Sequence, residues 1–213
     1  SSIEKPDIYL INQEDSIAAI SDLPYRVGVC KAVNISPEKD GIINRYADGS
    51  IIWRIYLKAE DAQAIGLGFS NLNLPDEAKL YVYTLDKKYI YGAFTKHNLS
   101  EGAFVIRPIP GDECILELNV PSEQLSLTQI EIDEIIYIYR NFEDVSSIHK
   151  KSTVSGACEV NISCNEGDAW QNQKRSVVKL LTKVASNVYF CSGSIVNNTA
   201  QDFTPYILTA AHC

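Results

Sequence analysis

The sequence of 213 residues predicts an all-β fold that begins with an antiparallel, jelly-roll-like β-sandwich over residues 1–142. Three observations predict this class. Short runs alternate apolar and polar residues, which places successive side chains on opposite faces of a strand. Val, Ile, Tyr and Thr, the residues enriched in strands, are plentiful, and helical periodicity is almost absent. Turn residues separate the runs, as expected for a sandwich of two sheets.

The strands of this sandwich follow one another from residue 50 onward. IIWRIYLK at 51–58 carries apolar residues at every second position and predicts a strand with one buried face. A short turn and a second strand are expected in 59–75. The Tyr-rich sequence 79–94 predicts a hairpin that turns near Asp86.

Two more strands are expected at the end of the sandwich. PGDECILELNVP at 110–121 alternates again. In LSLTQIEIDEIIYIYR at 125–140, the apolar face changes parity near Glu134. This change indicates a β-bulge, because one extra residue reverses the facing of all that follow.

Two features of the sandwich have alternative interpretations. The tyrosines of the hairpin could stack on carbohydrate, although cross-strand aromatic pairs more often stabilise a sheet. The sequence also leaves open whether Cys30 and Cys114 form a disulfide, because the required geometry cannot be read from it. Six cysteines in the chain favour an oxidising compartment.

The charge distribution predicts two modules joined by a linker. Residues 1–142 carry 21 acidic and 13 basic side chains and residues 143–213 carry six of each, so the net charge of −8 lies entirely in the first module. The polar, Ser-rich stretch 143–157 is the expected linker, and 158–213 is the second module. An acidic first module argues against nucleic acid as a partner. No run has the length of a membrane span.

Two short motifs in the second module carry the chemistry. CSGSIV at 191–196 precedes LTAAHC at 208–213, and the surrounding runs predict three strands. Imidazole is a base near neutral pH and can take the proton of a serine hydroxyl. In this order and spacing the two motifs resemble the trypsin-like serine peptidases. The resemblance implies that the three strands are the incomplete first β-barrel of a chymotrypsin-like double barrel.

Together with SGACEVNISCNEG at 155–167, the motifs resemble the lysyl endopeptidases, which are secreted bacterial enzymes. This resemblance implies that His212 is the general base, and the acid toward the leaving amine. It also implies that Cys191 and Cys213 form a disulfide around the histidine. Polypeptides cut after lysine are the implied substrates, and no metal or other cofactor is expected.

The first module is similar, in residues 66–98 above all, to the sandwich that precedes such peptidase domains in some bacterial proteins. It is therefore expected to be a pro-region or accessory domain that contacts the peptidase domain. Lys150 and Lys151 in the linker would form a processing site. Cys158 and Cys164 would pair with cysteines further along the chain.

In this family an Asp and then a Ser follow the histidine along the chain, and no GDSGG occurs in the sequence. We therefore expect the N-terminal portion of a longer, secreted or periplasmic bacterial enzyme, inactive by itself. The absence of methionine also favours a piece of a longer protein.

The sequence leaves other functions open. The sandwich could be a secreted binding or adhesion module with a vestigial protease segment, or an inhibitor or chaperone of its own protease. A triad of the α/β-hydrolase order would require G-x-S-x-G. The nearest segments, GFSNL at 68–72 and SGSIV at 192–196, do not match this pattern. A zinc site built from Cys158, Cys164, His212 and Cys213 lacks the usual ligand spacing.

Overall fold

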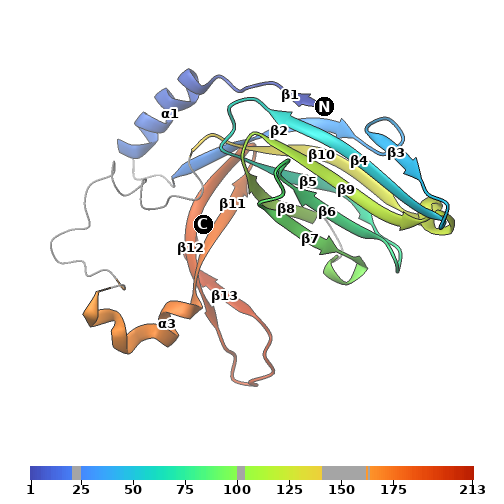
Figure 1. The fold of residues 1–213 in the computed structure, drawn as a ribbon. Coiled ribbons are helices and arrows are strands. Elements are labelled where there is room, and N and C mark those ends of the chain that lie inside the picture. Colours follow the sequence, from blue (N-terminus) through green and yellow to red (C-terminus); the bar gives the residue numbers. More distant parts are fainter. Residues whose placement is uncertain (21–24, 100–103, 141–161, 163) are drawn as a thin grey trace. The chain divides into compact units, whose positions relative to one another are not determined.

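The computed structural model describes residues 1–20, 25–99, 104–140, 162 and 164–213. Its contacts divide the chain into two units, both drawn in Figure 1. Unit 1 comprises Ser1–Ile8 and Gly28–Glu143, and unit 2 comprises Tyr9–Val27 and Asp144–Cys213. The segment Tyr9–Val27 thus groups with the end of the chain, and not with the sandwich sequence on either side of it.

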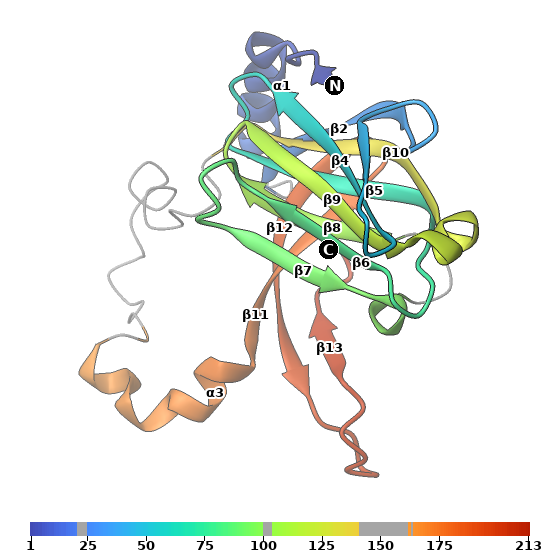
Figure 2. The ribbon, with the colours of Figure 1, turned by 45° about the vertical axis from the view of Figure 1, so that its right-hand side comes forward.

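The first sheet of unit 1 has the strand order β1-β4-β9-β6-β7, and β3 also pairs with β4. Figure 2 shows β4, β9, β6 and β7 side by side. All pairs are antiparallel except β1 with β4, which is parallel. The strands are β1 (Ser2–Ile3), β3 (Ile42–Arg45), β4 (Ser50–Ala59), β6 (Lys79–Tyr83), β7 (Ile90–Phe94) and β9 (Glu113–Pro121).

The second sheet of unit 1 has the antiparallel order β2-β10-β5-β8. Short 3₁₀ helices, η1 (Lys96–Asn98) and η2 (Ser122–Leu127), lie outside the sheets. The strands of the second sheet are β2 (Arg26–Ile35), β5 (Ala64–Asn73), β8 (Phe104–Pro110) and β10 (Gln129–Ile138). The predicted all-β sandwich is confirmed.

Strand alternation produces the core between the two sheets. Trp53 and Leu57 of β4 are fully buried, as is Leu116 of β9, and all belong to one hydrophobic cluster with Ile135 and Tyr137 of β10. These are the faces that the period of two predicts. The indole of Trp53 also donates a hydrogen bond of 2.7 Å to the backbone oxygen of Asp40, which satisfies its one polar atom.

The bulge expected near Glu134 is present. The register of β10 against both β2 and β5 shifts between Ile132 and Glu134. Ile130 and Ile132 belong to the core cluster before the shift, and Ile135 and Tyr137 belong to it after the shift. The extra residue therefore lets one strand keep its apolar side chains inside across a change of parity.

A polar cluster around Glu117 lies on the opposite face of β9. Its carboxylate accepts hydrogen bonds from Arg54 Nε at 2.6 Å, from the Tyr83 hydroxyl at 2.7 Å and from Asn119 Nδ2 at 2.8 Å. Burial raises the pKa of Glu117, but these three hydrogen bonds outweigh burial and hold the pKa below its ordinary value. The charged form of Glu117 is therefore part of the folded sandwich.

Unit 2 contains an antiparallel array of β11 (Val177–Val184), β12 (Asn187–Val196) and β13 (Tyr206–Thr209). In the part of the chain that is described, these strands do not close into a barrel. Two short helices, η3 (Asn165–Trp170) and α3 (Gln171–Ser176), precede β11.

The helix α1 (Ile8–Ile20) was not expected from the sequence. Its hydrophobic residues do not form one buried stripe, because Ile11 is buried while Tyr9, Leu10 and Ile17 are exposed. A helix of this kind gives little periodic signal. None of the described helices has the length and apolar character that a membrane span requires.

Candidate functional site

The candidate site lies at the end of β13, where the chain reaches His212. β13 pairs with the second half of β12, with Gly193 opposite Thr209 and Val196 opposite Tyr206. The Thr209 hydroxyl adds a hydrogen bond of 2.8 Å to the backbone oxygen of Ser192. These contacts fix the direction in which the chain leaves the sheet, three residues before the histidine.

The histidine is held by a turn and a covalent bond. The amide of Cys213 donates to the backbone oxygen of Ala210 at 3.0 Å, which closes a turn that includes His212. Cys191 and Cys213 form a disulfide with their Cα atoms 5.9 Å apart, the pairing that the family resemblance implied. The turn is thereby anchored to the middle of β12.

Gly193 permits the close approach of β12 and β13. A Cβ atom at this position would lie 2.9 Å from the backbone oxygen of Leu208 and 3.0 Å from the Ile207 side chain. A larger residue would therefore push β13 away from its partner. The glycine of the CSGSIV motif has a packing role that supports the histidine turn.

The His212 side chain is exposed, and within the described residues it makes no hydrogen bond or ion pair. The described residues also contain no group of three or more His, Cys, Asp or Glu side chains suited to a metal ion.

A cation and an aromatic ring meet on β11 and β12 near the disulfide. The ammonium of Lys179 on β11 lies 3.7 Å from the ring centroid of Phe190, the residue before Cys191. Burial lowers the pKa of Lys179. Phe190 and Cys191 are successive residues of β12, so this pair lies on the face of the strand opposite to the disulfide.

The motif Cys164-Asn165-Glu166-Gly167 forms the start of η3. Gly167 is buried, and a Cβ there would lie 2.1 Å from the backbone oxygen of Ile162. Its amide donates to the oxygen of Cys164 at 2.8 Å. This explains the glycine in the motif. Cys164 itself is an exposed thiol.

The structure bears on the pairing of Cys30 and Cys114, which the sequence left open. Cys114 is a buried thiol, so the disulfide with Cys30 is not formed. Tyr137 faces the core opposite Val29, so Cys30, the next residue along, faces the other side of its sheet. Burial raises the pKa of Cys114 to about 12. The predicted linker 143–157, with Lys150 and Lys151, lies outside the described residues, and so does Cys158.

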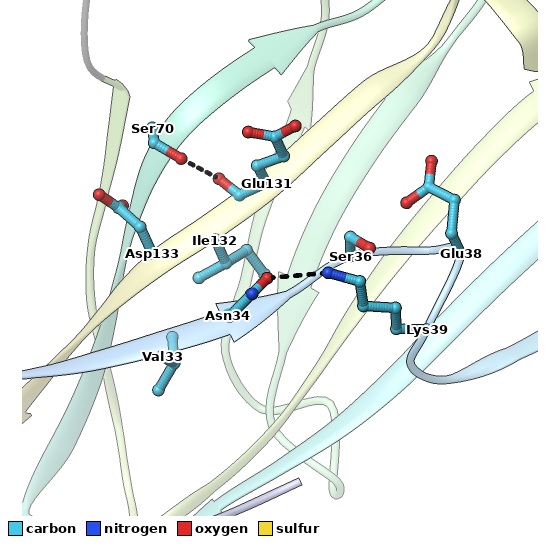
Figure 3. Close-up of a pocket in the computed structure, with 9 residues that line it drawn as sticks. All are labelled: Val33, Asn34, Ser36, Glu38, Lys39, Ser70, Glu131, Ile132 and Asp133. Atoms are coloured by element: carbon cyan, nitrogen blue, oxygen red, sulfur yellow. Dashed lines mark hydrogen bonds between the residues drawn. The ribbon is translucent and has the colours of Figure 1, made fainter.

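Unit 1 has a pocket of about 450 Å³ beside the end of β2 (Figure 3). Ser70 donates to the backbone oxygen of Glu131 and Lys39 donates to Asn34, each at 3.4 Å. Three carboxylates and one ammonium give the pocket a negative charge, and it contains none of the predicted site residues. Its lining consists of Val33, Asn34, Ser36, Glu38, Lys39, Ser70, Glu131, Ile132 and Asp133.

The tyrosines of the hairpin β6–β7 are engaged within the protein. The Arg107 guanidinium lies 4.1 Å from the ring centroid of Tyr91, and the Lys88 ammonium lies 5.2 Å from that of Tyr89. Cations of the same unit thus lie over these rings. This arrangement favours the structural interpretation of the aromatic residues over carbohydrate stacking.

Residues 152–213 match the family model described as the lysyl endopeptidase C-terminal domain. The match includes both motifs, the disulfide and His212, and it covers less than a third of the chain. The chain is therefore related to the lysyl endopeptidases. This relation implies a serine endopeptidase as the parent protein, with polypeptides as substrates.

Proposed function

We propose that the second module is the opening part of a trypsin-like catalytic domain and that His212 is its general base. One observation carries the proposal. The histidine follows β13 in a turn joined by a disulfide to β12, within the segment that matches the lysyl endopeptidase domain. A base of this kind must be held firmly and yet be accessible to its partners.

In the proposed mechanism the imidazole takes the proton of a serine hydroxyl as that oxygen attacks the scissile carbonyl. It then gives the proton to the leaving amine, so that one group serves as base and acid in turn. The serine and the carboxylate that orients the imidazole would come from the chain after Cys213. The exposed face of His212 supports this assignment, because the ring is available for both partners. Residues 1–213 by themselves would then be inactive.

The sandwich would be the pro-region or accessory domain of this enzyme. Relatives of the lysyl endopeptidases are typically secreted, and a secreted bacterial parent would agree with the disulfide in unit 2. Processing would occur in the linker at Lys150 or Lys151, by the enzyme itself if it cuts after lysine.

The proposal is tested on the secreted full-length parent. We expect it to hydrolyse a peptide with lysine before the scissile bond, and to discriminate against the same peptide with norleucine, which has nearly the same shape without the charge. N-terminal sequencing should find a mature start at Lys151 or Ser152. A chain ending at Cys213 should release no product. A secreted parent that keeps Ser1 and hydrolyses no peptide would contradict the proposal.

A further inference from the structure

The N-terminal segment Tyr9–Val27 is built into unit 2, although the whole sandwich sequence separates it from β11. The guanidinium of Arg26, near the end of this segment, binds residues of helix α1 near the beginning of the segment. Its Nε donates to Asp15 at 2.8 Å, and Nη2 donates to Glu14 at 2.9 Å and to the backbone oxygen of Ile11 at 3.0 Å. Arg26 thereby ties the start of β2 to helix α1.

The same guanidinium contacts residues 152–213, the part of the chain that matches the lysyl endopeptidase domain and is here called the peptidase segment. Arg26 Nη1 donates to the side-chain oxygen of Asn187, the first residue of β12, at 3.1 Å. The Arg26 side chain is 11% exposed and that of Asp15 is 8% exposed, so the ion pair between them is largely removed from water. A buried pair that loses one partner leaves the other charge without compensation, and this is costly.

Backbone pairing continues the contact. The amide of Phe190 on β12 donates to the backbone oxygen of Tyr25 at 3.0 Å, on the side of β12 away from β11. On that side β13 pairs only with Gly193–Val196. The N-terminal segment thus covers part of a strand edge that would otherwise present unpaired backbone groups.

Few hydrophobic residues in the described part of unit 2 are buried. Among the described hydrophobic residues of this unit, those that are buried are Ile11, Val27 and Val188. Two of the three belong to Tyr9–Val27, while β13 is exposed along its whole length. The strands of the peptidase segment therefore have little buried apolar surface of their own.

From these contacts we propose that Tyr9–Val27 is an intramolecular partner of β12, held by Arg26. When the linker is cut, this segment keeps the N-terminal region bound to the peptidase segment without a covalent connection. The inference rests on the proposed function only in taking the linker cut as the maturation step. The attachment itself is measured without any peptidase assay, so the two proposals can fail separately.

The test uses the 213-residue chain with residues 146–152 replaced by the recognition sequence of a site-specific protease. After the cut, size-exclusion chromatography without reductant, at micromolar concentration, should show both pieces in one peak. Arg26→Ala removes the charged donor to Asn187 and also the contacts that hold α1 against the start of β2, so it should raise the dissociation constant of the two pieces by more than about tenfold. Arg54→Ala is the matched control, since it removes the same side chain from an ion pair within the sandwich.

A second variant keeps the proposal testable if Arg26→Ala does not fold. Asn187→Ala removes one hydrogen bond to the guanidinium and should weaken binding by about tenfold. Hydrogen exchange at the Phe190 amide should become faster in both variants, but not in Arg54→Ala. Unmodified pieces that elute separately at micromolar concentration would overturn the proposal. Equal effects of the variants and the control would overturn the role of Arg26.

Discussion

The disulfide between Cys191 and Cys213 should determine how firmly the histidine turn is held. The perturbation is the double substitution of Cys191 and Cys213 by alanine. The two cysteines are 22 residues apart in sequence. In the chain-entropy model, closing a loop of this length removes enough freedom from the open chain to stabilise the closed form by about 3 kcal/mol. Since β13 is exposed along its length, little buried apolar surface compensates for the loss.

The free energy of opening β13 should therefore fall by about 3 kcal/mol, which corresponds to amide exchange roughly 150-fold faster. Hydrogen exchange followed by mass spectrometry, with a peptide covering residues 206–213, measures this directly. Cys164→Ala, which removes an exposed thiol of the same unit, is the control and should leave the rate unchanged. If the double variant exchanges in 206–213 at the original rate, the turn is held by other contacts and the reasoning is wrong.

Three further predictions concern packing and pH. Leu116→Ala should lower the free energy of unfolding of the sandwich in urea by about 2–5 kcal/mol, because Leu116 is fully buried. Ile115→Ala, on the half-buried face of the same strand, should lower it by less than about half as much. Equal losses would contradict the assigned faces. The lowered pKa of Glu117 stabilises the fold above its ordinary pKa of 4.5, and this contribution is lost as pH falls through the lowered value. Glu117→Gln should therefore reduce the loss of stability measured between neutral pH and the acid range, and an unchanged pH dependence would refute the role of Glu117. Gly193→Ala should separate β12 from β13, seen as faster exchange at Leu208, and unchanged exchange there would show that the strands tolerate a Cβ.

Most of the sandwich could be predicted because its information is local. Alternation in 51–58 and 110–121 gave the buried faces of β4 and β9, and the change of parity located the bulge at Glu134. An alternation with a period of two can be recognised from neighbouring residues alone, so the buried face of a strand can be predicted without knowing which strands pair with it.

Two features could not be predicted because they depend on distant partners. Arg26 and Asn187 are 161 residues apart in the sequence and nothing local connects them. The helix α1 leaves Tyr9 and Ile17 exposed, so it lacks the stripe that marks an amphipathic helix. The roles of Glu14 and Asp15 follow only from their ion pairs with Arg26.

The candidate site was partly predictable for a different reason. A short motif specifies residue types whose contacts are themselves local, as in the turn from Ala210 to Cys213. The close approach at Gly193 and the hydrogen bond from Thr209 to Ser192 depend on the register of two strands, which the motif does not contain. Family resemblance supplied the disulfide pairing, since spacing alone does not determine which cysteines meet.

The most direct measurement is kcat/KM of the full-length parent and its His212→Ala variant on a lysyl peptide. His97→Ala is the matched control, because His97 is an exposed histidine of η1 in unit 1. We predict that His212→Ala lowers kcat/KM by about four to six orders of magnitude, with the 191–213 disulfide intact, while His97→Ala stays within about twofold of the parent. A folded His212→Ala enzyme that retains the activity of the parent would show that the imidazole at the end of β13 is not the base.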